Sequence, residues 1–127
     1  MVFDRIRLSD QALEMVALRF RSLGEPTRLK ILSLIEGGEM TVGQLVDHLR
    51  CSQANISKHL KVLMDAGVLS RRVCGTSVYY SIRDPVVLKI CDVVCDGVAD
   101  GLKSRIESFG YRLAPKQARG KKRTGKL

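Results

Sequence analysis

At 127 residues, with 45% hydrophobic residues and a net charge of +9, the chain fits a single domain that can build its own core. The positive charge favours a polyanionic partner, most simply nucleic acid. No apolar run approaches the roughly 20 residues that span a bilayer, and the N-terminus lacks the basic-then-apolar order of a secretion signal. We therefore expect a cytoplasmic protein with no membrane partner, whose four cysteines are reduced thiols.

The charge is concentrated at the C-terminus. Residues 111–127 hold seven cations and no acid, so the rest of the chain carries only +2 of the +9. We expect this segment to be a basic disordered tail, which either binds phosphates without sequence preference or has no partner. The folded domain then covers residues 9–110 and follows an N-terminal arm at residues 1–8.

Two helices open the folded domain. Ser9 can cap a first helix that runs to about Leu23, and Gly24 breaks it. Pro26 suits the first position of a second helix, where its missing amide costs nothing. This second helix is strongly apolar and ends at the glycine pair 37–38, so we expect it to be buried.

Residues 41–69 predict a helix-turn-helix. Thr41 and Gln44 have the spacing of a capping box at the start of the first helix. Ser52 can cap the second helix. The apolar stripe of the second helix recurs at i, i+4 and i+7 and consists of Ile56, Leu60 and Leu63.

The other faces of this second helix are polar and basic. Amides and hydroxyls can read base edges in the major groove of DNA, and lysines can meet phosphates. A solvated helix hairpin without any partner is the alternative, because polar surface residues need none. The candidate DNA contacts are Gln53, Asn55, Ser57, Lys58 and Lys61.

A β-hairpin follows the helix-turn-helix. Residues 68–74 and 78–82 predict two strands around a turn at residues 75–77, so the whole segment reads as a winged helix-turn-helix. The wing adds Arg71 and Arg72 at its foot and Thr76 in its turn as candidate DNA contacts. Arginines on an edge strand can also serve only to discourage edge-to-edge pairing.

A long helix closes the domain, from Val86 to about Phe109 with Asp84 as its cap. The expected fold is mainly α with a small β-hairpin, in the order H-H-H-H-E-E-H. Both the first and the last helix are amphipathic, and they either pack on their own domain or form the interface of a homodimer. We favour the dimer, which would place two recognition helices one DNA turn apart on an inverted-repeat operator.

The sequence resembles the ArsR/SmtB family of bacterial winged-helix repressors. The resemblance implies a homodimer through the first and last helices, and operator binding that an inducer or a redox event abolishes. It places base-reading residues at Gln53, Ser57 and Lys58 and the wing tip near Gly75. The matching stretches are Leu23–Leu32, Thr41–Leu45, Ser52–Leu63, Ala66–Leu69 and Arg72–Tyr80.

Two inducer sites of that family are missing. The segment 40–45 has no cysteine, so the family's Cys-x-Cys site is absent. The last helix carries Asp84, Asp92, Asp96 and Asp100 on or before it but no histidine, which makes a zinc site with imidazole ligands improbable there. His59 is better explained as a packed structural residue of the recognition helix.

Cys91 and Cys95 remain as the candidate sensor. At i and i+4 they share one face of the last helix, about 5–6 Å apart between Cβ atoms, and soft sulfur ligands select thiophilic ions. We expect no permanent cofactor and an As(III) or Sb(III) inducer, with a third sulfur from Cys51, Cys74 or the partner subunit. Cysteine also behaves as a small hydrophobe, so interface packing is the alternative role of the pair.

Three functions other than an ion-sensing repressor are considered. The thiols can act instead as a redox or persulfide switch of a repressor with the same fold. A winged helix can also serve as a protein-interaction adaptor, although the basic face argues against it. An enzyme is disfavoured, because the sequence offers no nucleophile–base pair, no Gly-rich phosphate loop and no His-rich metal site.

Overall fold

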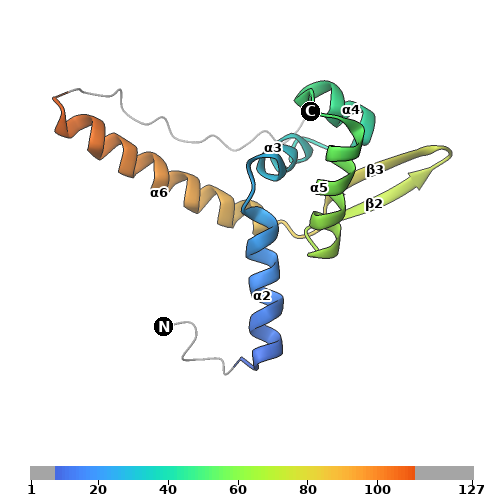
Figure 1. Ribbon diagram of the computed structural model, residues 1–127, viewed down its shortest axis with the longest axis horizontal. Helices are drawn as coiled ribbons and strands as arrows, with labels where there is room; N and C mark the ends of the chain where they lie inside the picture. Colours follow the sequence, from blue (N-terminus) through green and yellow to red (C-terminus); the bar gives the residue numbers. More distant parts are fainter. Residues whose placement is uncertain (1–7, 111–127) are drawn as a thin grey trace. The chain divides into compact units, whose positions relative to one another are not determined.

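The computed structural model describes residues 8–110, which form two compact units (Figure 1). The first unit ends at Asp84, and the second begins at Pro85 and contains α6. Most of the expected arm at 1–8 and all of the expected tail at 111–127 lie outside the described residues. The elements are α2 (Asp10–Leu23), α3 (Pro26–Ile35), β1 (Met40–Thr41), α4 (Val42–Leu49), α5 (Gln53–Asp65), β2 (Leu69–Cys74), β3 (Ser77–Ile82) and α6 (Val86–Ser108).

The predicted helix starts in the first unit are confirmed. The hydroxyl of Ser9 accepts from the Ala12 amide at 3.1 Å, and Pro26 is the first residue of α3. Thr41 and Gln44 form the capping box with distances of 3.2 and 2.9 Å. Ser52 caps α5 in the same way by accepting an amide of its first turn at 3.1 Å. Local hydrogen bonds of this kind fix where each helix begins.

The start of α6 differs from the sequence prediction. The residue at its N-cap position is Pro85, not Asp84, and Pro85 provides no side-chain cap hydrogen bond. The Asp84 carboxylate accepts from the guanidinium of Arg19, which belongs to α2. An ion pair with a residue 65 positions away cannot be foreseen from local spacing.

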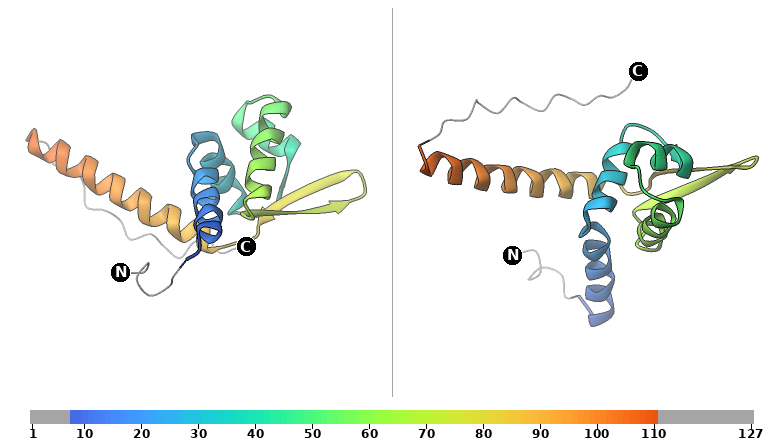
Figure 2. Two further views of the ribbon diagram at one scale, coloured as in Figure 1. Left: turned by 60° about the horizontal axis from the view of Figure 1, so that its bottom comes forward. Right: turned by 45° about the horizontal axis from the view of Figure 1, so that its top comes forward.

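The wing is part of a three-stranded antiparallel sheet in the order β1-β3-β2. The strand β1, which has only two residues and pairs Met40 with Tyr80, was not expected from the sequence. The expected three-residue turn is also wrong, because Cys74 pairs with Ser77 and leaves only Gly75 and Thr76 between the strands. Gly75 adopts φ +62°, which fits a tight two-residue hairpin. The hairpin projects from the helices of its unit in both views of Figure 2.

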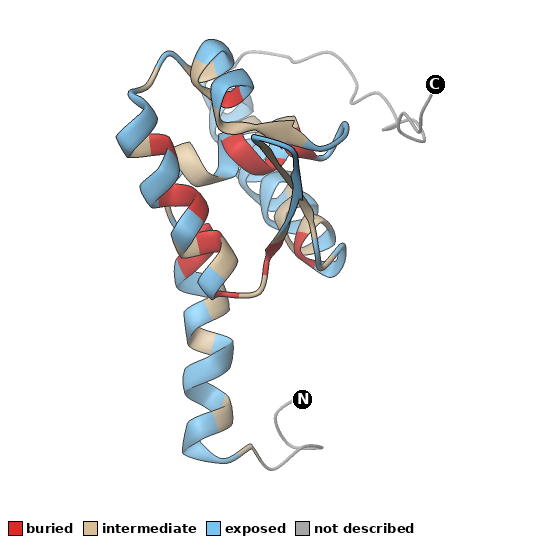
Figure 3. Ribbon diagram, turned by 90° about the vertical axis from the view of Figure 1, so that its right-hand side faces the viewer, coloured by how far each residue is buried: buried red, intermediate tan, exposed pale blue. Residues whose placement is uncertain are grey.

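The core of the first unit lies where α3, α4 and α5 meet the base of β2 (Figure 3). The predicted stripe of α5 is confirmed as buried, and the apolar face of α3 is buried with it. The outer turns of α2 and residues 71–76 of the wing are exposed, whereas β3 is half-buried along its length. Among the described residues, no helix is long and apolar enough to cross a membrane. The fully buried apolar side chains include Ile31, Leu45, Ile56, Leu60, Leu63, Val68 and Leu69.

Candidate DNA-binding surface and cysteine pair

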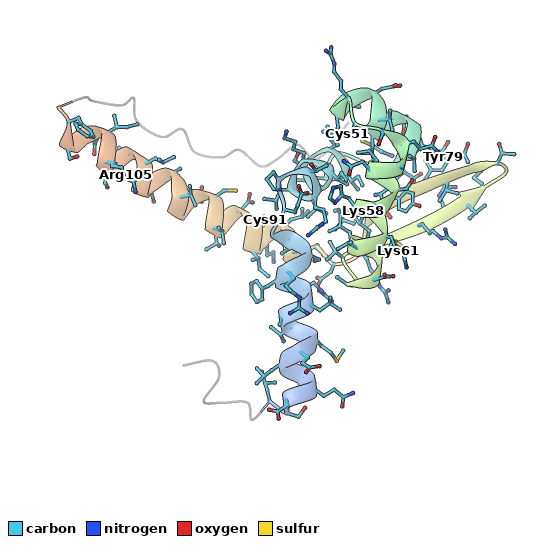
Figure 4. All side chains as sticks on the ribbon, viewed as in Figure 1. Cys51, Lys58, Lys61, Tyr79, Cys91 and Arg105 are labelled. Carbon is cyan, nitrogen blue, oxygen red and sulfur yellow. The ribbon has the colours of Figure 1, made fainter. Side chains whose placement is uncertain are left out.

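The exposed face of α5 lies opposite its buried stripe. Ser57, Lys58 and Lys61 are exposed and share this face by helical spacing. Figure 4 labels the two lysines on α5. Gln53 is exposed at the N-terminal end of the helix, whereas Asn55 is only half-exposed on its flank. The structure therefore brings together four of the five residues that the sequence indicated on this helix.

Lys61 has one acidic neighbour on its own helix. Its ammonium group lies 3.1 Å from the carboxylate of Asp65, one turn further on, with 76% and 62% of the two side chains exposed. Ion pairs this exposed contribute little to stability. Lys61 can therefore exchange Asp65 for a DNA phosphate at small cost.

A partly buried polar cluster contacts α5 on its inner side. His59, which is 7% exposed, lies on the inner side of α5 with its Nδ1 atom 3.1 Å from Nη1 of Arg28. Its Nε2 atom lies 3.7 Å from a carboxylate oxygen of Glu25. Partial desolvation raises the pKa of Glu25, but the Arg28 amide and His59 outweigh it and leave the pKa below its ordinary value. This packing agrees with the structural role expected for His59.

Arg28 extends this cluster to α2. Its Nε atom donates to the backbone carbonyl of Ser22 at 2.6 Å, and its Nη2 atom donates to that of Arg21 at 3.2 Å. One guanidinium thereby joins the last turn of α2 to the middle of α5. The fork geometry of arginine allows all these donors to be used at once.

The two arginines of the wing differ in their surroundings. Arg72 donates to both carboxylate oxygens of Glu39, at 3.3 and 2.5 Å, and its guanidinium lies 4.8 Å from the centre of the Tyr79 ring. The Arg72 hydrogen bond holds the pKa of Glu39 below its ordinary value. The pKa of Arg72 is raised in turn, chiefly by Glu39 and to a smaller degree by Cys74.

From the sequence, Arg72 was expected to bind a DNA phosphate, and its contacts with Glu39 and Tyr79 were not expected. Glu39 comes from the loop after α3, and Tyr79 is the direct cross-strand partner of Arg72. The hairpin register would have revealed Tyr79, but no local signal points to Glu39, 33 positions away. Arg71 and Thr76 are exposed, as the sequence analysis expected of DNA contacts.

None of the four cysteines, all of which the structure describes, forms a disulfide. Cys91 is half-buried and Cys95 exposed on α6, one turn apart. Cys51 lies between α4 and α5 (Figure 4) with its thiol 3.6 Å from the Leu49 carbonyl. Cys74 is the last residue of β2. Within residues 8–110, no three His, Cys, Asp or Glu side chains are grouped so that they could hold a metal ion.

Comparison with known proteins identifies the family. Residues 25–71 match the model of the arsR family of bacterial regulatory proteins. The transcriptional repressor SdpR of Bacillus subtilis is 41% identical over 68 residues, which cover 54% of this chain and 76% of that repressor. The chain belongs to the ArsR family. As a family member it is a DNA-binding transcriptional repressor and not an enzyme, as the sequence analysis expected.

Two further proteins, one of them a solved structure, are similar to this ArsR-family chain. A probable mercury resistance operon repressor of Streptomyces lividans is 43% identical over 75 residues, 59% of this chain and 58% of that protein. The homodimeric winged helix-turn-helix domain of Mb0332 from Mycobacterium bovis aligns with a TM-score of 0.68 at 27% identity. That alignment covers 77% of this chain and 94% of the neighbour, which confirms the predicted winged fold.

Proposed function

We propose that this ArsR-family member is a homodimer that binds an inverted-repeat operator and releases it when Cys91 and Cys95 bind a thiophilic ion. The observation that carries DNA recognition is the division of α5 between a fully buried stripe and an exposed polar face. The Arg28–His59 contact and the core fix the inner side, so the outer side is presented as a rigid surface. A rigid surface of amides, hydroxyls and ammonium groups suits the major groove.

The roles of the DNA contacts follow from their chemistry. Gln53, Asn55 and Ser57 carry the groups that can read base edges, whereas cations bind phosphates at any sequence. Arg72 reaches a phosphate only by leaving Glu39 or by sharing its donors, so Arg71 is the readier phosphate ligand of the wing. The phosphate contacts are Lys58, Lys61, Arg71 and Arg72, with Thr76 at the wing tip.

Apolar side chains left exposed by the single chain support the homodimer. On α6, Val94, Val98 and Leu102 are 58%, 59% and 51% exposed and recur every four residues along one side of the helix. On α2, Phe20 is 56% exposed. Exposed apolar surface of this extent on two helices marks an interaction site. The homodimeric neighbour supports a second copy of the chain as the partner.

The inducer of this proposal is As(III) or Sb(III). Two thiolates one turn apart on α6 can bind one such ion, and a third thiolate completes the three-sulfur set that it prefers. Cys51, Cys74 or a thiol of the partner subunit supplies the third donor, because α6 has only two cysteines. The mercury repressor among the relatives supports a thiophilic ion as the class of signal.

A thiol switch is the second candidate for the signal. Cys95 is exposed, so peroxide or polysulfide can reach it. Oxidation of two thiols to a disulfide would reduce one peroxide to water, and it is easier between subunits than within one helix turn. The fold and the DNA contacts are the same in this case.

The test begins with an operator selected from a random duplex pool by the protein itself. Fluorescence anisotropy then follows release of that duplex during separate titrations with arsenite, antimonite, cadmium, zinc, peroxide and polysulfide. Release by arsenite or antimonite alone supports the proposed inducer, and release by the oxidants alone supports the thiol switch. Equal affinity for every duplex sequence would contradict the specific repressor.

A further inference from the structure

Arg19 of α2 connects two distant points of the first unit. Its Nε atom donates to the backbone carbonyl of Ala66 at 2.7 Å, and its Nη1 atom donates to the Asp84 carboxylate at 2.5 Å. The Arg19 and Asp84 side chains are 36% and 31% exposed, so the ion pair is partly shielded from water. The rigid guanidinium of Arg19 therefore fixes the Ala66 carbonyl and the Asp84 carboxylate relative to each other.

Both acceptors occupy junctions of the fold. Ala66 is the C-cap residue of α5, where the recognition helix ends. Asp84 follows β3 and is separated from α6 by Pro85 alone. The two junctions lie next to the paired strands at the base of the wing, because Val68 precedes β2, Arg83 follows β3, and the Arg83 amide donates to the Val68 carbonyl at 2.9 Å.

Gly67 leaves room for the guanidinium. It adopts φ +76°, and a Cβ atom added there would come within 3.1 Å of Nη2 of Arg19. A side chain at this position would be strained by the backbone and would push against the arginine. The turn after α5 is thus shaped so that Arg19 can lie against it.

We propose that Arg19 is a positioning residue for operator recognition, because it ties the end of α5 to the residue from which the chain enters α6. This inference rests on the proposed homodimer, in which α6 contributes to the interface. Arg19 itself lies on α2, the other helix of that proposed interface, so the same guanidinium also joins α2 to the end of α5. Holding α2 against the end of α5 limits how far the two recognition helices of a dimer can shift relative to each other.

The measurable consequence is a preference for one operator spacing. A dimer with fixed recognition helices fits half-sites at one separation, whereas a loosened dimer accepts several. Loss of the Arg19 link should therefore reduce discrimination between spacings and leave the affinity for an isolated half-site unchanged. A residue that only stabilises the fold would lower the melting temperature without changing this preference.

The experiment uses the full chain and its selected inverted-repeat duplex. Arg19→Lys keeps the charge, but a lysine lacks the fork that reaches the Ala66 carbonyl and Asp84 together. Asp84→Asn removes the anionic partner, and the double variant tests whether the two act as a unit. Arg21→Lys, an exposed position of the same helix, is the matched control. Dissociation constants are measured for the parental spacing, for spacers altered by one and two base pairs, and for a single half-site.

For the parent and the control, we expect each altered spacer to weaken binding by about tenfold or more. The ratio of the dissociation constants for altered and parental spacers should fall at least threefold in each single variant, and the double variant should lower it no further. The affinity for a single half-site should stay within about twofold of the parent. Unchanged ratios in Arg19→Lys and Asp84→Asn would overturn the inference while leaving the dimeric repressor intact. A parent without any spacing preference would contradict the proposed dimer, and this inference with it.

Discussion

The recognition helix of the first unit and α6 differ in how far their apolar side chains are buried. In the first unit, Ile56 and Leu63 of the recognition helix are completely buried by α3, α4 and the base of the wing. On α6, by contrast, Val98 and Leu102 remain more than half exposed. The chain thus completes one core by itself and leaves a second apolar surface exposed, which the proposed dimer would cover. The stable core and the candidate DNA contacts therefore belong to the first unit, whereas the proposed dimer depends on exposed apolar side chains of α2 and α6.

The largest effect should come from the core of the first unit. Leu63→Ala removes buried methyl groups and should cost about 2–5 kcal/mol of unfolding free energy. Leu102→Ala on α6 makes the same chemical change at an exposed position and should cost much less in dilute protein. Urea unfolding of both variants at several protein concentrations measures the difference. Equal losses would show that α6 is as well packed in one chain as α5.

Charge placed on the apolar surface of α6 should separate the subunits. Val98→Asp puts a carboxylate where a dimer interface would be dry, and burying it unpaired is unfavourable by several kcal/mol. We expect a monomer in analytical ultracentrifugation, with at least about tenfold weaker binding to the inverted repeat. Asp100→Asn, which changes charge on the polar side of the same helix, is the control. A Val98→Asp dimer with full affinity would place the interface elsewhere.

Replacing either cysteine of the pair should abolish the response to the inducer and leave operator affinity unchanged. Cys91→Ser and Cys95→Ser should each abolish release by arsenite, because one remaining thiolate cannot hold the ion against water. Operator affinity without arsenite should stay within about twofold of the parent. Ala99→Ser, on the same helix, controls for the added hydroxyl. If both cysteine variants release DNA at the parental arsenite concentration, the pair serves only packing.

On the recognition helix, base readers and phosphate contacts should behave differently. Gln53→Ala or Ser57→Ala should relax the preference at one base pair by about 1–3 kcal/mol. Lys58→Ala should weaken all duplexes alike and reduce the slope of log affinity against log salt by about one. Competition binding against single-base operator variants at several salt concentrations distinguishes the two outcomes. A salt slope unchanged in Lys58→Ala would remove this lysine from the phosphate contacts.

The smallest effect should appear at the wing. Glu39→Gln removes the carboxylate that occupies Arg72 and should raise DNA affinity a few-fold with a steeper salt slope. The pKa of Glu39 is lowered in the fold, so the ion pair is fully present above the ordinary carboxyl pKa and is lost as pH falls through the lowered value. The parent should therefore approach the affinity of Glu39→Gln only in acid, which anisotropy at a series of pH values measures. An equal gap between the two proteins at every pH would rule out this carboxylate as the cause.

Local sequence determined the helices of this protein. Ser9, Thr41 and Ser52 each bond an amide three residues ahead, so the cap and its helix lie within one short segment of sequence. The period of the apolar residues then identified the buried side of α5. The helix-turn-helix and the exposed residues of the recognition helix follow from these two signals, and the comparisons confirm the winged fold.

Tertiary structure alone decided which charged groups meet. The wing register was missed because a turn shorter by one residue changes every cross-strand partner, and Tyr79 therefore faces Arg72 where a three-residue turn would place Tyr80. Arg72 with Glu39 and Arg19 with Asp84 are 33 and 65 positions apart, beyond the reach of any helical or strand period. Long side chains find such partners only after the core has brought their elements together. The sequence therefore predicts the candidate DNA-binding surface but not the ion pairs around it.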